Sequence, residues 1–233
     1  MNEKPGYKMT EVGVIPEDWE TADLEAFTSF ISYGFTNPMP TVESGIYMIT
    51  AKDINCGKIQ FDSARLTTED AFRIRLSAKS KPKAGDLLLT KDGTLGRLAL
   101  VDERVICINQ SVAVLRPNFK VNPLFLKTLL EAPLYQEKML ENAGGSTIKH
   151  IYITIVNRMK VAVPRSKTEQ EAIAGALSDA DALIESLERL IEKKRRIKQG
   201  AMQELLTGKK RLPGFQVKHG YKQTEVGVGG HGN

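Results

Sequence analysis

Hydrophobic residues follow two different patterns along the chain, and the change falls close to residue 165. Before it, short apolar runs alternate with Gly, Pro, Asn and Asp, which is typical of β-strands joined by turns. The runs lie at residues 47–50, 86–90, 97–101, 111–117 and 159–164. Two helical stretches interrupt them, at residues 122–130 and 133–142. Residues 1–165 are therefore expected to form a mixed α+β domain with a curled sheet.

After residue 165 the pattern predicts one long helix. Ser166 and Thr168 each precede a glutamate by three positions, the spacing of a capping box. No proline follows until Pro213, and Gly208 is placed to end the helix. A helix over residues 168–207 would be about 60 Å long at 1.5 Å per residue.

The predicted helix carries an apolar seam with the spacing of a coiled coil. Its expected contact positions are Ile173, Leu177, Ala180, Ile184, Leu187 and Ile191. Lys194 and Lys198 occupy the next two seam positions, so the apolar line is interrupted there or shifts sideways. No second long helix is predicted to cover the seam, which favours an antiparallel coiled coil in a two-fold dimer. The alternative is that the helix packs along its own domain.

A short repeat links the two ends of the chain. Residues 7–14 read YKMTEVGV and residues 221–228 read YKQTEVGV, so seven of eight positions recur. The chain therefore resembles one repeat unit followed by the opening of a second. We expect three regions: a domain over 1–165, a spacer and dimerisation helix over 166–208, and a tail over 209–233 that carries the truncated repeat.

Composition narrows the class of protein. Hydrophobic residues make up 41% of the chain and charged residues 26%, as in soluble globular proteins. No apolar run approaches the roughly 18 residues of a membrane span, and the first residues lack a signal peptide's apolar core, so a cytoplasmic protein without membrane contact is expected. Cys56 and Cys107 are far apart and have no histidine neighbours, which predicts buried, reduced thiols rather than a disulfide framework or zinc site.

Three segments carry residues that could contact nucleic-acid phosphates. The candidates are Arg73, Arg75, Lys79, Lys81 and Lys83 in a run without acids, Lys91, Gly93, Thr94 and Arg97 in TKDGTLGR, and Ser146, Thr147 and Lys149 in GGSTIKHI. Each segment has a structural alternative: a solvated loop, a hairpin whose glycines satisfy turn geometry, and a connecting loop. Nothing in the sequence selects a base-reading residue among Asn37, Asn55, Gln60, Arg73 and Arg75.

Catalytic signals are weak. Residues 122–125 read NPLF, close to the Asn-Pro-Pro-aromatic motif of adenine methyltransferases, but the third position is Leu and no glycine-rich cofactor turn follows a strand. The acids Asp53, Asp86 and Asp92 are scattered, and the histidines lack metal-ligand or triad spacing. We therefore expect no catalytic residues, no metal and no cofactor.

Several segments, in order, resemble a type I restriction-modification specificity subunit. They are GYKMTEVGVIPEDWE, AGDLLLTKDGTLGRLALV, NQSVAVLRP, GGSTIKHI and VAVPRSKTEQEAIAGAL. Members of that family have two target recognition domains and two long conserved helices, whereas this chain has one of each. The second copy of the opening segment departs at once, because GGHGN stands in place of IPEDWE.

The resemblance implies a half-length specificity subunit that dimerises. Two identical recognition domains would read an interrupted palindrome in double-stranded DNA. The assembly would recruit methyltransferase subunits, which hold the methyl donor, and a translocating restriction subunit. Two alternatives remain: a small DNA methyltransferase with a fused recognition domain, and a coiled-coil interaction module that does not bind DNA.

Overall fold

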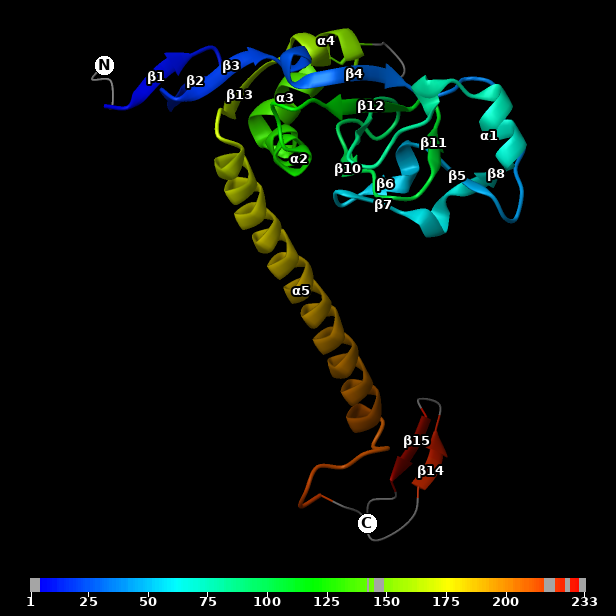
Figure 1. Cartoon of the computed structure of the whole chain (residues 1–233). Coiled ribbons are helices and arrows are strands. Elements are labelled where there is room, and N and C mark those ends of the chain that lie inside the picture. Colours follow the sequence, from blue (N-terminus) through cyan, green and yellow to red (C-terminus); the bar gives the residue numbers. More distant parts are fainter. Residues whose placement is uncertain (1–4, 142, 145–148, 216–220, 225–226, 231–233) are drawn as a thin grey trace. The chain divides into compact units, whose positions relative to one another are not determined.

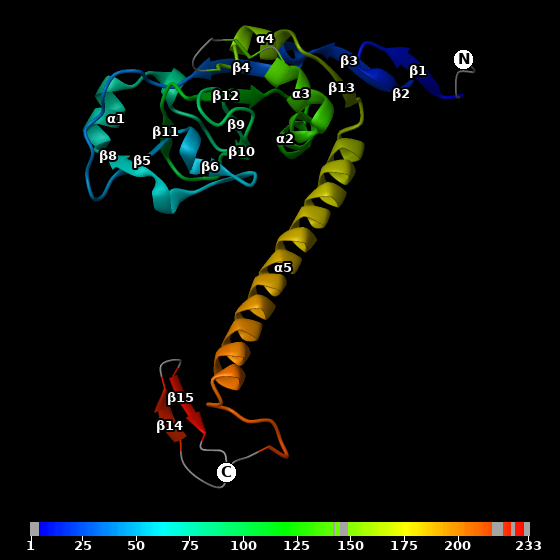
Figure 2. The same ribbon diagram turned by 180° about the vertical axis from the view of Figure 1, so that it is seen from behind.

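The computed structural model describes residues 5–141, 143–144, 149–215, 221–224 and 227–230 (Figures 1 and 2). Its contacts divide the chain into two compact units, Met1–Ala176 and Leu177–Asn233. The division lies inside the long helix rather than at its start. The first turns of that helix therefore belong to the globular unit.

The first unit is built from short strands and helices. Its helices are α1 (Glu69–Arg75), α2 (Pro123–Glu131), α3 (Pro133–Glu141), α4 (Ile153–Arg158) and the start of α5 (Lys167–Leu206), with 3-10 turns η1 (Leu24–Phe27), η2 (Ala51–Asp53), η3 (Phe61–Ser63) and η4 (Ala78–Ser80). Its strands are β1 (Tyr7–Thr10), β2 (Gly13–Pro16), β3 (Trp19–Asp23), β4 (Thr28–Tyr33), β5 (Ile46–Ile49), β6 (Ile54–Asn55), β7 (Lys58–Ile59), β8 (Arg65–Thr67), β9 (Leu87–Thr90), β10 (Leu98–Leu100), β11 (Ile106–Ile108), β12 (Val112–Pro117) and β13 (Lys160–Pro164).

A four-stranded antiparallel sheet, ordered β10-β9-β12-β4, forms the centre of this unit (Figure 1). Alternate residues along its strands enter two different cores. Leu87, Leu89 and Leu115 pack with the helices α2, α3 and α4 on one face. Leu88 and Val114 pack on the other face with Ile49, Ile106 and Ile108 from β5 and β11. Both faces are buried, which explains why these strands read as continuous apolar runs.

The predicted mixed α+β class is confirmed, but the strands are spread over several sheets. In the described part of the chain, β11-β5-β8 forms a second sheet that includes a parallel pair, and the other strands form two-stranded ladders. Five predicted strands and three predicted helices match β5, β9, β10, β12, β13, α2, α3 and α5 to within one or two residues.

One expectation about the cysteines was wrong. Cys107 is buried on β11 as predicted, and burial raises the pKa of its thiol to about 12. Cys56 is exposed instead. It lies in the turn between β6 and β7 with a φ of 48°, a left-handed conformation that places it at a surface hairpin tip.

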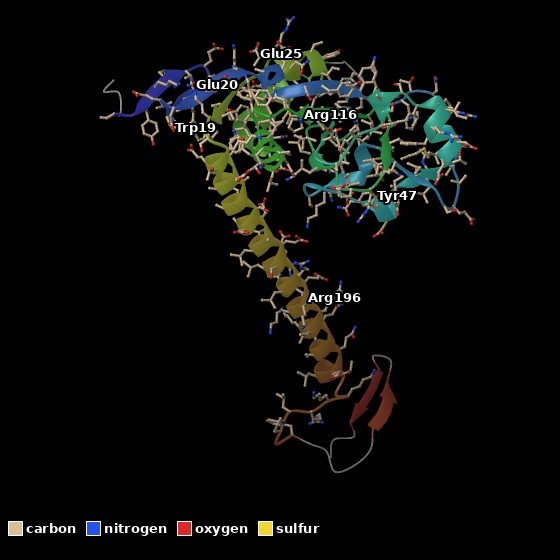
Figure 3. The ribbon with its side chains drawn as sticks, in the orientation of Figure 1. Trp19, Glu20, Glu25, Tyr47, Arg116 and Arg196 are labelled. Atoms are coloured by element: carbon tan, nitrogen blue, oxygen red, sulfur yellow. The ribbon has the colours of Figure 1, made fainter. Side chains whose placement is uncertain are left out.

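The start of α5 is fixed by contacts within the first unit. Ser166 Oγ accepts from the Glu169 backbone N–H at 3.4 Å, so of the two predicted caps the serine is the one used. The Glu169 carboxylate accepts from the Trp19 indole at 3.1 Å, and Trp19 opens the strand β3 that pairs with β13 (Figure 3). Ile173 packs against the core of this unit. Because Ile173 is only partly buried there, the dimer contact predicted for it stays a prediction.

In the second unit, the α5 residues from Leu177 to Leu206 are almost all exposed, and their side chains extend outward from the helix (Figure 3). Leu177, Ile184, Leu187 and Ile191 are 47%, 55%, 49% and 51% exposed. Ala180 is exposed as well. Five of the six predicted seam residues thus lie uncovered in the single chain.

The repeated segments at the two ends fold alike. In the first hairpin, β1 pairs with β2 so that Tyr7 faces Pro16 and Thr10 faces Gly13. In the second, β14 (Tyr221–Thr224) pairs with β15 (Gly227–Gly230) so that Tyr221 faces Gly230 and Thr224 faces Gly227. Equivalent positions of the repeat therefore pair in the same register.

No helix in the described ranges combines the length and the apolar character needed to cross a bilayer.

Candidate nucleic-acid interface

Three chain segments meet around the loop that precedes β12. On one side, the Phe35 backbone N–H donates to Ile108 O at 3.0 Å and the Gln110 N–H donates to Phe35 O at 2.8 Å. On the other side, Ser111 O accepts from the Lys91 backbone N–H at 2.9 Å. We call residues 33–39, 91–97, 109–111 and 149–151 the loop surface.

The approach of these segments requires glycine at position 34. A Cβ atom built there would lie 1.9 Å from the carbonyl oxygen of Ile108, and no side chain fits in that space. Asn109 stiffens the neighbouring turn, since its Oδ1 accepts from the Ser111 N–H at 3.1 Å and the Ser111 hydroxyl at 2.6 Å. That hydroxyl accepts in turn from the Ala51 N–H at 2.9 Å. The loop surface is thus held by the backbone of the core sheet.

The 91–97 loop is also tightly fixed. Thr94 Oγ1 donates to Ala51 O at 3.2 Å, and Arg97 donates from one guanidinium nitrogen to Ile54 O at 3.1 Å. Gly96 lies against Gln136 of α3, which donates to Gly96 O at 3.0 Å. Gly93 has a φ of 80°, which favours glycine at this turn, and the space around it is open. The hydroxyl of Thr94 is therefore used internally, while Arg97 keeps further N–H donors.

Asp92 joins two of the predicted contact segments. Its carboxylate lies 2.8 Å from Lys91 Nζ and 2.6 Å from His150 Nδ1, and the backbones of Asp92 and His150 form a β-bridge. Burial favours the neutral acid, but the hydrogen bonds and charges of Lys91 and His150 outweigh it and lower the pKa of Asp92. Lys91, whose Nζ also lies 5.5 Å above the ring of Tyr33, is thus largely neutralised.

The third predicted segment, the basic run, forms α1 and η4 rather than a simple loop. Thr68 caps α1 by accepting from the Ala71 N–H at 3.1 Å. Arg73 forms an exposed pair with Asp70 at 3.1 Å. Lys81 lies 4.7 Å above the Phe72 ring. Arg75, Lys79 and Lys83 are exposed and remain candidates for phosphate contact.

Of the remaining predicted residues, one lies on the loop surface. Lys149 is exposed next to His150. Ser146 and Thr147 lie outside the described residues. The structure therefore brings TKDGTLGR and the described end of GGSTIKHI together through Asp92 and His150.

A hollow of about 260 Å³ opens between the 33–39 segment and the loop before β12. Its polar lining includes Asn37, Arg65, Asn109 and Gln110. Asn109 is committed to Ser111, whereas Asn37, Arg65 and Gln110 are exposed. Exposed amides and guanidinium groups are the side chains that pair with the base edges of adenine and guanine. Of the five base-reading candidates in the sequence, only Asn37 lines the hollow.

Sequence reasoning missed Gln110 and His150. Gln110 stands in NQSVAVLRP, a segment that predicts a strand. Only the Asx-type pattern of Asn109 and Ser111 indicates a turn before that strand. His150 has no local signal, because its partner Asp92 is 58 positions away in sequence.

Comparisons with known proteins agree on one family. Residues 39–195, more than half of the chain, match the family model described as type I restriction modification DNA specificity domain. A putative type I restriction enzyme MjaX specificity subunit of Methanocaldococcus jannaschii is 27% identical over 95% of this chain and 52% of its own length. The EcoBI specificity subunit of Escherichia coli is 28% identical over 76% of this chain and 38% of its own length.

The fold has solved counterparts. The structure of the HsdS subunit from Thermoanaerobacter tengcongensis superposes with a TM-score of 0.59 at 15% identity, covering 85% of this chain and 47% of that one. At this identity the likeness concerns the fold. The chain spans about half the length, or less, of the relatives it matches.

Proposed function

We propose a function that starts from one fact: the chain belongs to the family of type I restriction modification DNA specificity domains, whose model its residues 39–195 match. In this proposal the chain is the DNA-reading subunit of a type I restriction-modification system in the cytoplasm. Its own task is recognition of double-stranded DNA, without catalysis and without a cofactor. The family match gives the kind of domain. The exposed polar residues of the loop surface support the proposal that this surface contacts DNA.

The proposed DNA contact rests on one observation. Two exposed amide side chains, Asn37 and Gln110, line the hollow on the loop surface. An Asn or Gln amide can form two hydrogen bonds with adenine, and Arg65 on the same rim can do so with guanine. The backbone bonds that hold this surface to the core sheet reduce the conformational freedom lost on binding. These three residues are proposed to read bases.

Phosphate contacts are proposed for exposed cations of the same unit. They are Arg75, Lys79 and Lys83 on α1 and the turn after it, Arg97, and Lys149. Arg73, Lys81 and Lys91 are proposed for a weaker role, because each already has an acidic or aromatic neighbour. Phosphate contacts position a protein on DNA and carry no sequence information themselves.

A homodimer completes the proposal. The exposed seam of α5, from Leu177 to Ile191, has the spacing of a coiled coil, and a second antiparallel copy would cover it. Two identical recognition domains related by a two-fold axis would read an interrupted palindrome, with the gap between half-sites set by the paired helices. Methyltransferase subunits would bring the methyl donor to this assembly, and a restriction subunit would join the same complex.

Equilibrium binding of the full chain to labelled duplex DNA, followed by fluorescence anisotropy over a series of salt concentrations, tests the proposal. Phosphate contacts predict that the logarithm of affinity falls linearly with the logarithm of salt concentration. Absence of salt-sensitive binding would instead favour a coiled-coil module that does not bind DNA. Heat released on titrating S-adenosylmethionine into the chain alone would favour the fused methyltransferase.

Base reading is tested by removing the amides. Asn37→Ala and Gln110→Ala should each weaken binding to the preferred DNA by about 1–3 kcal/mol, roughly 5- to 150-fold, and leave binding to unrelated DNA nearly unchanged. Asn55→Ala is a matched control, because Asn55 is an exposed amide on β6 away from the hollow. Equal losses on both DNAs, or a loss in the control, would contradict base reading by this pair.

A further inference from the structure

The hollow on the loop surface has an apolar floor beneath its polar rim. Phe35, Met39 and Met48 line it together with its polar residues. The same three side chains belong to a small hydrophobic cluster with Leu76 and Cys107. Met48 is 5% exposed, and Phe35 and Met39 are partly buried. This cluster therefore opens to the surface at the point where the exposed amides lie.

Strand pairing fixes this floor. In the antiparallel pair of β5 and β8, Met48 lies opposite Arg65, and in the parallel pair of β11 and β5 it lies opposite Cys107. Residues directly opposite each other point to the same face of a sheet, so Arg65 is held at the rim beside Met48. The three strands lie together at the end of the first unit that carries α1 (Figure 1). The floor is thus part of a sheet rather than of a loop.

The wall and the rim of the hollow are joined by backbone contacts. Phe35 and Asn109 form a parallel β-bridge. The next residue, Gln110, donates its backbone N–H to Phe35 O at 2.8 Å. One exposed amide and one apolar side chain of the hollow are therefore held together by the main chain. The second amide, Asn37, precedes Met39 by two positions in the other segment.

An apolar floor beside exposed amides matches the chemistry of one kind of base pair. In the major groove, adenine offers a donor and an acceptor that pair with the amide of Asn or Gln. Its partner thymine carries a 5-methyl group, which is the only alkyl group that the four bases present there. An A·T pair therefore offers both a polar edge for the rim and an apolar group for the floor.

We propose that the hollow takes the 5-methyl group of a thymine whose adenine partner is read by Asn37 or Gln110. This inference rests on the DNA recognition proposed above, and it adds Phe35, Met39 and Met48 as residues that favour A·T over G·C at that pair. The methyl group leaves water for an apolar surface, which is favourable. The volume of about 260 Å³ is several times the roughly 30 Å³ that a water molecule occupies in the liquid, so the methyl group fits with the adjoining edge of its ring.

Replacement of single thymines by uracil tests the inference with the full chain, because uracil lacks only the methyl group. The probes are duplexes of the preferred DNA sequence in which each thymine in turn is uracil. The readout is the dissociation constant from fluorescence anisotropy. At one thymine of the recognised motif, the replacement should weaken binding by about fourfold, the value for one buried CH₂ group. Replacement of the other thymines should have a smaller effect.

A double-mutant cycle locates the methyl group on the protein. Met39→Ala truncates the wall of the hollow, so the same uracil replacement should lose most of its effect in this variant. Met39→Gln keeps the length of the side chain and makes its tip polar, and it should act in the same way if the alanine variant proves unstable. Met9→Ala is the matched control, because Met9 is 64% exposed on β1 and does not line the hollow. The control should keep the full uracil effect.

A second modified base separates the methyl contact from the amide contact. Exchange of the sensitive A·T pair for G·C removes both contacts, and 5-methylcytosine in that G·C pair returns a methyl group to the same place in the major groove. The methylated duplex should bind about fourfold more tightly than the unmethylated one. Met39→Ala should abolish this difference. Equal binding of the two duplexes to the wild-type chain would overturn the inference.

The outcomes distinguish failure of the methyl contact from failure of the proposed function. Sequence-specific, salt-sensitive binding in which no thymine responds to uracil would overturn the methyl contact and leave the proposed function standing. A uracil effect of the same size in the wild-type chain and in both Met39 variants would place the methyl group elsewhere and overturn the contact as well. Binding without sequence preference, or no binding, would contradict the proposed function itself and the inference with it.

Discussion

The buried amide of Gln170 ties the first turn of α5 to the rest of the first unit. Its side chain is fully buried. Its Oε1 accepts from the Asn122 N–H at 2.7 Å, and its Nε2 donates to Lys120 O at 3.0 Å and to Pro164 O at 2.8 Å. One side chain thus connects the strand before the helix, the helix itself and the cap of α2.

Replacement of Gln170 by Met keeps the length of the side chain and removes all three hydrogen bonds. Each contributes roughly 0.5–1.5 kcal/mol net, and the backbone N–H left behind costs more when no water reaches it. A loss of about 2–4 kcal/mol is expected. For a unit of this size that lowers the melting temperature by roughly 4–16 °C.

The assay is urea unfolding followed by tryptophan fluorescence. The chain contains one tryptophan, Trp19, whose indole donates to Glu169 beside Gln170, so its emission reports on this junction. Gln199→Met is the matched control, because Gln199 is exposed on the same helix and should change stability by less than about 0.5 kcal/mol. If Gln170→Met unfolds at the wild-type midpoint, the amide does not anchor the helix and the reasoning is refuted.

Three further predictions concern the dimer, the core and acid stability. Ile184→Glu with Leu187→Glu should give folded monomers by light scattering, and surviving dimers would refute the seam. Asp86→Asn should cost about 3 kcal/mol in urea unfolding, since Asp86 is 2% exposed and lies 2.7 Å from Arg116; an unchanged midpoint would contradict this. Because the pKa of Asp92 is lowered in the folded protein, its ionised carboxylate stabilises the fold fully at a pH above 3.8, the ordinary pKa of the group. This stabilisation is lost only as the pH falls below that value. The difference in free energy of unfolding between wild type and Asp92→Asn should therefore disappear only in acid. A difference that disappears at higher pH would contradict the lowered pKa of Asp92.

Elements with strong periodic signals were predictable from sequence. The run at 111–117 is β12 almost residue for residue, because four successive apolar side chains divide between the two faces of a buried sheet. The helix predicted at 122–130 is α2, since Asn122 caps it and Pro123 fits its first turn. The long helix was predicted to within one residue at each end.

Short elements that depend on tertiary contacts were not predictable. The seven residues of α1 are too few to show helical periodicity, and its threonine cap is one of many in the sequence. The first strands, β1 to β4, carry mixed polar residues, and their pairing with each other or with distant strands defines them. Sequence therefore suggested a single curled sheet where the structure has several.

The candidate site was predictable by segment but not by residue. Lys91 reads as a free cation, yet it pairs with the adjacent Asp92, whose carboxylate is also bound by the distant His150. Gln110 was invisible among strand residues, and Gln170 was read only as part of a helix start. The contacts of Asp92 with His150 and of Gln170 with Asn122 and Lys120 join residues about 50 positions apart or more, and such contacts leave no local pattern.

Selection of bound duplexes from a random DNA pool, followed by sequencing, tests the central claim most directly. A dimer of identical recognition domains predicts one short motif present twice, in inverted orientation, with a constant gap between the copies. A single uninterrupted motif, two different motifs or a variable gap would contradict a symmetric dimer with a fixed spacer.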